Sequence, residues 1–144
     1  MQGLVQMKIK SFLGLPPEAL DIRTEVFVKE QGFVDEEDEI DGLATHLVAY
    51  KDEKPIATCR FFKERGGEDF VLGRLCVLKE KRSAGVGARL LLEAEKGARA
   101  LGAPALKLHS QIGAREFYQK CGYEQSGEVE LEQGKEHIWM KKYL

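Results

Sequence analysis

The sequence predicts an α+β domain in which a mixed, mostly antiparallel β-sheet is flanked by helices. Three observations lead to this fold class. The length of 144 residues suits one compact core. The first half of the chain contains several strand patterns joined by short turns, and the second half alternates strand and helix patterns before a closing hairpin. We therefore expect residues 1–144 to form a single domain without internal repeats.

The elements of the first half are predicted from hydrophobic periodicity. Apolar residues at alternate positions indicate a strand near the N-terminus, and Pro16 and Pro17 suit the first turn of the helix that follows. The segment around Gly73 is almost continuously apolar, which is typical of a central strand covered on both faces, and the glycine itself indicates a β-bulge or a close backbone approach. The predicted elements are a strand at 4–12, a helix at 16–32, an acidic loop at 35–41 and strands at 45–50, 55–63 and 70–78.

The elements of the second half follow from the same patterns. An apolar stripe at helical spacing extends from Gly85 to Leu101, and Gly102 ends that helix. Gly134 supplies the turn of the closing hairpin. The predicted elements are a helix at 85–101, a strand at 105–109, a helix at 113–121 and hairpin strands at 123–131 and 137–143, so that the whole chain has the order β-α-β-β-β-α-β-α-β-β.

The charge balance and the cysteines exclude several classes of function. With 22 basic and 24 acidic residues the net charge is −2, so the overall charge favours neither a nucleic acid nor an anionic membrane as partner. Cys59, Cys76 and Cys121 are odd in number, far apart and outside any C-x-x-C pair, so we expect neither a disulfide scaffold nor a metal site. The chain starts without the apolar core of a signal peptide, and no apolar run reaches the length of a membrane span, about 18 residues. The expected location is the cytoplasm.

A glycine-containing loop between the buried strand and the long helix has the features of a phosphate-binding site. It spans residues 82–87 (RSAGVG). Free backbone N–H groups and the positive end of the helix dipole favour an anion at such a place. A dinucleotide-binding fingerprint is excluded because Leu90 stands where a third small residue is needed, and a P-loop is excluded because the Gly-Lys-Ser/Thr triplet is absent. The alternative is a glycine-rich turn that binds no ligand.

The motifs around this loop follow one another in a recognisable order. L-x-V at 75–77 leads into R-x-x-G-x-G at 82–87, and after the long helix come L-x-L at 106–108, Q-x-x-A-x-x-F-Y at 111–118 and G-Y at 122–123. This succession resembles the Gcn5-related N-acetyltransferase (GNAT) superfamily, in particular an uncharacterised bacterial branch of it. The resemblance covers nearly the whole chain, because the predicted strand order also matches the family fold.

The resemblance implies that acetyl-CoA binds in a V-shaped opening between the strand that ends at Val77 and the strand at 106–109. In the family, the loop that matches 82–88 binds the pyrophosphate through backbone amides, and the strand that matches 75–77 pairs with the pantetheine arm. The Gln111 position often carries Asn in the family. The residues implied to contact the cofactor are Leu75, Cys76, Val77, Arg82, Ser83, Ala84, Gly85, Val86, Gly87, Ala88, Gln111, Phe117 and Tyr118.

Acyl transfer from a thioester to an amine needs a neutral amine, stabilisation of the carbonyl oxygen and a proton for the departing thiolate. Tyr118 matches the tyrosine that protonates the thiolate in many family members. The alternative for Tyr118 is a purely packing role like that of Phe117. The family resemblance implies that a backbone N–H near Val77 stabilises the oxygen.

The identity of the base stays open at this point. Many family members carry a Glu on the central strand, but residues 73–76 (GRLC) contain no carboxylate. Glu30 and His46 are the first candidates for the base, followed by His109 and His137. The alternative for Glu30 is a solvated helix end, and each histidine is alternatively a satisfied polar residue on a strand.

Two further features bear on the mechanism. Cys76 lies next to the expected thioester position and is either an acylated nucleophile or, as is common for a cysteine on a buried strand, a small hydrophobic residue. Direct transfer in a ternary complex is therefore the predicted route. The loop at 35–41 contains six carboxylates, which either attract a cationic amine or form a solvated surface.

The predicted function is that of an acetyl-CoA-dependent N-acetyltransferase that acts on a primary amine of a small molecule or a protein. The acidic loop favours a cationic acceptor. The alternative is a catalytically silent CoA-binding sensor or interaction module. A homodimer is compatible with the sequence, and no metal is expected.

Overall fold

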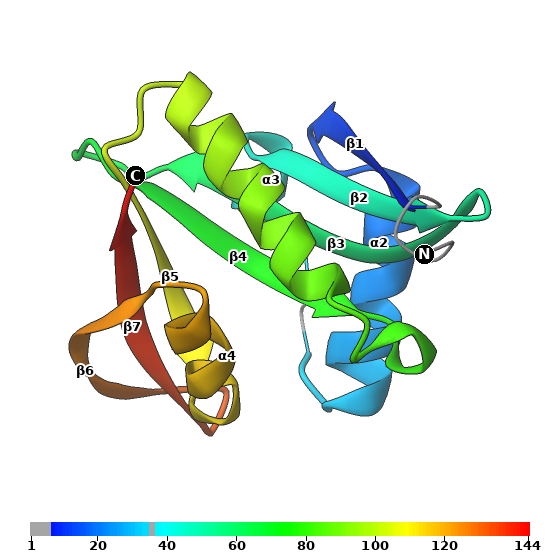
Figure 1. The fold of residues 1–144 in the computed structure, drawn as a ribbon. Coiled ribbons are helices and arrows are strands. Elements are labelled where there is room, and N and C mark those ends of the chain that lie inside the picture. The colour runs from blue at the N-terminus through cyan, green and yellow to red at the C-terminus, as the bar shows by residue number, and fades with distance from the viewer. Residues whose placement is uncertain (1–6, 35–36) are drawn as a thin grey trace.

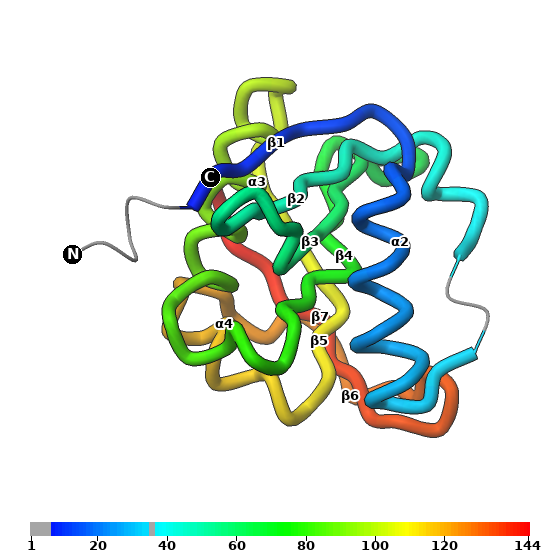
Figure 2. Tube along the Cα trace, turned by 90° about the vertical axis from the view of Figure 1, so that its right-hand side faces the viewer, coloured from blue at the N-terminus to red at the C-terminus, as the bar shows by residue number. Residues whose placement is uncertain are grey.

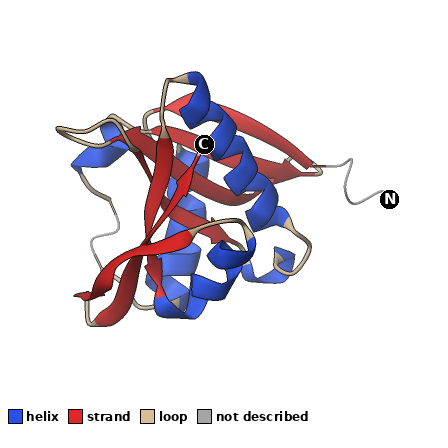
Figure 3. Ribbon diagram, turned by 60° about the vertical axis from the view of Figure 1, so that its left-hand side comes forward, coloured by secondary structure: helices blue, strands red, loops and turns tan. Residues whose placement is uncertain are grey.

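The computed structural model describes residues 7–34 and 37–144. In this part of the chain seven strands form one sheet in the order β1-β2-β3-β4-β5-β7-β6, with helices on both faces (Figures 1 and 3). The strands are β1 (Met7–Leu13), β2 (Thr45–Lys51), β3 (Lys54–Lys63), β4 (Phe70–Val77), β5 (Ala105–Gln111), β6 (Glu124–Glu132) and β7 (Lys135–Tyr143). The helices are α2 (Pro17–Arg23), α3 (Val86–Ala100) and α4 (Arg115–Lys120). The predicted α+β class and the order of strands and helices are confirmed.

The sheet opens between its two central strands. All neighbouring strands are antiparallel except β4 and β5, which are parallel. Their pairing is limited to three residues of each strand and ends at the pair Leu72 and Leu108. Beyond that pair the two strands diverge, as the green and yellow strands in Figure 1 show. The opening implied by the family resemblance is therefore present.

A β-bulge lies on β4 at the start of this opening. Opposite β3, Gly73 pairs with Arg60 and Cys76 pairs with Thr58, so two residues of β4 occupy the space of one residue of β3. One of the two, Arg74, has a φ of 56°, in the left-handed region. The bulge that Gly73 indicates is thus confirmed. A bulge leaves the extra residue outside the regular hydrogen-bond ladder, so β4 turns its backbone away from β3 here.

Two apolar cores hold the helices against the sheet. On the α3 side, Leu90 and Leu91 pack with Leu106 and Leu108 in the larger core. A Cβ atom at Gly97 would lie 2.7 Å from the Phe61 ring, so the glycine allows α3 to lie directly on β3. On the α2 side, a smaller core contains Ala19, Ile22, Val26, Val48 and Cys76. Among the described residues, no helix has the length and apolar composition needed to cross a membrane.

The helix expected at 16–32 is not a uniform α-helix. It begins as predicted after Pro16, but α2 passes at Thr24 into a π-helical turn, Thr24–Glu30. The N–H of Gln31 donates to the carbonyl of Val26, five residues earlier, at 3.0 Å. Periodicity did not predict this wider turn, which positions the residues that follow it beside the opening of the sheet. The first strand is described from Met7, so the predicted positions 4–6 lie outside the described residues.

Candidate active site

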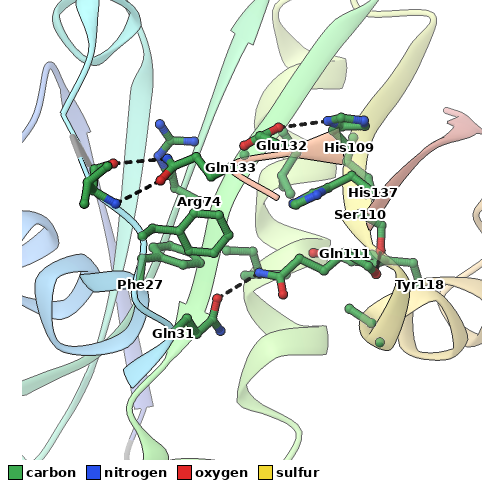
Figure 4. A pocket seen from close by; sticks show the side chains of 18 of the residues that line it. Phe27, Gln31, Arg74, His109, Ser110, Gln111, Tyr118, Glu132, Gln133 and His137 are labelled. Atoms are coloured by element: carbon green, nitrogen blue, oxygen red, sulfur yellow. Dashed lines mark hydrogen bonds and ion pairs between the residues drawn. The ribbon is translucent and has the colours of Figure 1, made fainter. Parts of the chain in front are cut away.

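The divergence of β4 and β5 leaves a cavity of about 540 Å³ on the α2 side of the sheet. Phe27 and Gln31 come from the π-helical turn and its end, and Arg74 comes from the bulge. The opposite wall is formed by β5 and the β6–β7 hairpin, with His109 and His137 among its residues (Figure 4). Polar side chains from four separate segments therefore meet in one cavity.

A second hollow, of about 280 Å³, adjoins this cavity on the side of α3. Leu75, Arg82 and Tyr118 line both spaces. The residues predicted to contact CoA that line the second hollow are Leu75, Cys76, Val77, Arg82, Gly87, Phe117 and Tyr118. The predicted residue Gln111 lines the larger cavity instead. The two spaces together form a continuous candidate site for two substrates, with Tyr118 at their junction.

The loop at 82–88 leads into the first turn of α3 with its backbone donors uncapped. Gly85 is the N-cap of α3, has a φ of 77° and provides no side-chain cap. The first intrahelical bond is donated by Arg89 to the carbonyl of Gly85 at 3.1 Å, so the preceding N–H groups have no partner within the helix. The first turn contains no acidic residue. These features fit a pyrophosphate, which needs several N–H donors and a positive helix end.

Because Gly87 has no side chain, nothing projects from the backbone of this loop at that position. A Cβ atom there would lie 3.5 Å from the Phe117 ring and 3.8 Å from Val77, which is ordinary contact. A longer side chain has to extend over the second hollow or displace Phe117. Gly87 is therefore suited to a backbone that a ligand approaches closely.

Comparison with known proteins identifies the family. A family model described as an acetyltransferase (GNAT) domain matches residues 17–144. The uncharacterized N-acetyltransferase YjcF of Bacillus subtilis is 42% identical over 129 residues, which cover 87% of this chain and 90% of YjcF. This chain belongs to the GNAT acetyltransferase family. The predicted resemblance is confirmed, and the chain is an acyltransferase.

Solved structures with GNAT folds superimpose closely on this chain. An acyl-CoA N-acyltransferase from Pseudomonas aeruginosa has a TM-score of 0.83 at 27% identity, over 94% of this chain and 99% of the other. An aminoglycoside 6'-N-acetyltransferase complexed with coenzyme A has a TM-score of 0.76 at 18% identity, over 94% of this chain and 96% of the other. The second likeness concerns the fold. The bulge carries Arg74, and residues 73–76 contain no carboxylate, so the bulge supplies no acidic candidate for a base.

Glu30, the first candidate for the base, is hydrogen-bonded to Arg82 in the loop at 82–88. The Arg82 guanidinium donates to both Glu30 carboxylate oxygens at 2.7 Å, and its Nε donates to the carbonyl of Val77 at 2.9 Å. The hydrogen bonds from Arg82 lower the pKa of Glu30, which weakens it as a base. Glu30 lines neither cavity. In this structure Glu30 holds Arg82 in place, which is a correction to its predicted role.

His46, the second candidate, is buried away from the site. Its side chain has no solvent exposure, and Nε2 lies 3.0 Å from the carbonyl oxygen of Asp41. Burial is the main cause that lowers the pKa of His46. His46 lines neither cavity, so it cannot reach an acceptor amine there. The prediction of His46 as base is therefore corrected. The alternation of residues along the strand could not exclude His46 as the base, because β2 is covered on both faces.

Two carboxylates of the acidic segment, Asp38 and Asp41, belong to an ion-pair network. Arg60 binds Asp38 at 2.6 Å and Asp41 at 2.8 Å, and Arg23 binds Asp41 at 2.8 and 2.9 Å. Arg74 extends the network to the cavity wall through a 3.1 Å contact with Asp38. Although burial would raise the pKa of Asp41, the hydrogen bonds from Arg23 hold it well below its usual range. Of the other four acidic positions, Glu37 and Glu39 are exposed, and 35 and 36 lie outside the described residues.

The predicted acid and the alternative nucleophile have different environments. Tyr118 is nearly buried, and this burial raises the pKa of its phenol, so the hydroxyl keeps its proton at physiological pH. Cys76 is also buried and packs with Ile22 and Val26 in the core beneath α2. These contacts agree with a small hydrophobic role for Cys76.

Several residues of the larger cavity had no signal in the sequence. Gln31 accepts a hydrogen bond from the Gln111 amide at 2.9 Å, which joins the end of the π-helical turn to β5. At the turn of the β6–β7 hairpin, the Gln133 amide donates to the Val34 carbonyl at 3.1 Å and accepts from its N–H at 2.9 Å. We call this pair of bonds the Gln133–Val34 bridge. Figure 2 shows the hairpin turn lying beside the end of the helical segment. Such tertiary neighbours cannot be inferred from local spacing.

Proposed function

We propose that this protein transfers the acetyl group of acetyl-CoA to a primary amine of a small molecule or a protein, by direct transfer in a ternary complex. The observation that carries the proposal is the pair of adjoining spaces that meet at Tyr118. The second hollow and the uncapped turn of α3 suit the pantetheine arm and the pyrophosphate. The larger, polar cavity suits the amine.

The chemistry requires one bond to form and one to break. The amine nitrogen attacks the thioester carbonyl, the C–N bond forms, and the C–S bond then breaks. Tyr118 supplies the proton that the thiolate sulfur takes up, since its raised pKa keeps the phenol protonated until the thiolate appears. The bulge on β4 turns a backbone segment out of the ladder beside Leu75, in the region where the carbonyl oxygen needs a donor.

Binding of the cofactor is tested with thermal unfolding in the presence of CoA. A ligand that binds the folded state alone raises Tm by mass action. We expect CoA to raise Tm of the wild type and to have no effect on Gly87→Glu, which places a negative side chain at the uncapped turn. Gly42→Glu is the matched control, because the position is exposed and a Cβ atom there meets open space. No shift at millimolar CoA would contradict the assignment of the second hollow.

Catalysis is tested by measuring thiol release from acetyl-CoA across a panel of amines. Turnover with any of these amines supports the proposal, and mass spectrometry of the acceptor should show one added acetyl group. CoA binding without thiol release for any amine would instead favour a CoA-binding sensor. The lack of a carboxylate at the bulge is the observation that favours this second function.

A further inference from the structure

Two histidines line the larger cavity, and their hydrogen bonds give them different chemistry. The Nδ1 atom of His109 lies 3.0 Å from a carboxylate oxygen of Glu132, and its Nε2 lies 3.4 Å from one of Glu130. This Nε2 is buried. Nδ1 of His109 is thus engaged by Glu132, while its Nε2 is shielded from solvent and without a hydrogen-bond partner among the described residues, so neither nitrogen is open to an amine in the cavity.

His137 presents one nitrogen as an acceptor. Its Nδ1 lies 2.9 Å from the backbone carbonyl of Lys135. A carbonyl oxygen only accepts, so Nδ1 carries the hydrogen, and in the neutral ring Nε2 carries the lone pair. Among the described residues, no donor is bonded to this Nε2. Figure 4 shows the ring extending from β7 into the cavity.

The ring of His137 is fixed by its neighbours. Phe33 contacts it edge-on, with 6.4 Å between ring centroids, and His109 lies 5.0 Å away in a tilted arrangement. His109 is itself stacked on Trp139 at 4.7 Å. The residue is 4% exposed, so these contacts leave the ring little freedom to turn away from the cavity. The titratable and charged groups that surround it are His109 from β5, Glu130 and Glu132 from β6, Lys135 from its own strand and Arg74 across the cavity.

We propose that His137, through Nε2, is the base that takes the proton from the acceptor amine. This role rests on the proposed function, since it needs an amine in the larger cavity. The amine nitrogen loses one proton to Nε2 as its bond to the acetyl carbon forms, and the thiolate gains a proton at its sulfur from Tyr118. The imidazolium then returns its proton to solvent and the Tyr118 phenolate takes one up, so that the products are the amide and the free thiol and both side chains are restored. His109 is a positioning residue that supports the ring from β5.

The test uses His137→Asn in the full chain, because the Asn side-chain amide can replace Nδ1–H as donor to the Lys135 carbonyl while the base at Nε2 is lost. We expect kcat/KM for an alkylamine to fall about 10²- to 10⁴-fold near neutral pH, the range of general acid–base catalysis. We expect kcat/KM of the wild type to fall toward acidic pH, and in the variant this fall should instead follow the titration of the amine itself. CoA binding and Tm should stay close to those of the wild type.

His109→Asn is the matched control, because it removes an imidazole from the same cavity without removing the proposed base. It should lower kcat/KM less than His137→Asn does and should keep the acid limb of the pH profile. In the wild type, nitrogen NMR should show a neutral His137 ring protonated at Nδ1. A neutral ring protonated at Nε2, or an unchanged pH profile in an active His137→Asn, overturns the role of His137. An absence of turnover by the wild type would overturn the proposed function itself.

Discussion

Arg82 and Glu30 are joined by two hydrogen bonds of 2.7 Å, which tie the first residue of the loop at 82–88 to the end of the π-helical turn. The contact links the part of the protein that is proposed to hold CoA with the segment that lines the acceptor cavity. Because the Arg82 charge is compensated by a carboxylate, the loop presents mainly backbone donors to a phosphate.

Replacing this carboxylate by an amide separates a positioning role from a catalytic one. Glu30→Gln leaves Arg82 with an uncompensated charge, so CoA should bind about two- to five-fold more tightly at low salt, and the gain should fade at high salt. The acid limb of the pH–rate profile should remain. Glu25→Gln is the control, since Glu25 pairs with the exposed Lys29 on the same helical segment. A loss of kcat above about 10²-fold, with loss of the acid limb, would restore Glu30 as the base.

Tyr118→Phe should retain folding and CoA affinity but lower kcat by about ten-fold or more, because it removes the proton donor at the junction of the two spaces. Steady-state kinetics and calorimetry with CoA measure the two effects. Phe117→Leu alters packing of the same helix without removing a donor, and should lower Tm more than it lowers kcat of the folded protein. Wild-type turnover by Tyr118→Phe across the whole pH range would mean that another group protonates the thiolate.

Asp41→Asn should destabilise the fold strongly, because it removes the charge shared by Arg23 and Arg60, both of which are buried. Breaking a buried ion pair costs about 3–5 kcal/mol, which urea unfolding at neutral pH would measure. Glu39→Gln, an exposed change in the same segment, should cost little. An equal and small effect of both variants would contradict a structural role for this network.

The Asp41 carboxylate also predicts how the free energy of unfolding depends on pH. The pKa of Asp41 is lower in the folded chain than in the unfolded chain, so the unfolded chain binds protons first as the pH falls. Its contribution to stability is therefore fully present above the unfolded pKa, about 4, and decreases toward lower pH. Urea unfolding of the wild type between neutral pH and about pH 3 should show this decrease, and Asp41→Asn should show a shallower one. Parallel curves would assign the acid sensitivity to other groups.

The Gln133–Val34 bridge predicts an effect on acceptor binding. Gln133→Ala removes two exposed hydrogen bonds, each of which contributes about 1 kcal/mol, so KM for the amine should rise by about ten-fold or less while kcat changes little. Hydrogen exchange of the Val34 N–H should accelerate, since its acceptor is lost. Gln125→Ala is the control, because the Gln125 side chain donates to the carbonyl of Gly127 on its own strand. An unchanged exchange rate would show that the bridge does not form in solution.

Most of the fold was predictable because its signals are local. Alternation, proline and glycine positions located the strands and helices, and Gly73 indicated the bulge that the structure places at its neighbour Arg74. The loop before α3 was also predictable, since glycine spacing and a helix start are sequence-adjacent features. The π-helical turn was not predictable, because a wider turn changes the hydrogen-bond pattern without a distinctive composition.

The acceptor side of the site was predicted less well, because it depends on which distant segments meet. Glu30 has a carboxylate that could act as a base, but in the folded protein this carboxylate forms an ion pair with Arg82. His46 lies on a strand buried on both faces, so alternation could not tell whether it reaches a cavity. His137 was a weaker candidate in the sequence, and only the hairpin geometry shows that its Nδ1 is bonded to Lys135 and that its ring faces the cavity.

The π-helical turn determines the directions in which the residues directly after it point. An α-helix advances by about 100° per residue, whereas a wider turn accommodates an extra residue without moving the end of the helix forward by a full step. With the turn in place, Gln31 bonds to Gln111, and Val34 bonds to Gln133. Deleting one residue between 24 and 30 would return the segment to α-helical pitch and rotate both contacts away from the cavity. The shape of the larger cavity therefore depends on the number of residues in a helix, not only on the identity of the side chains that line it.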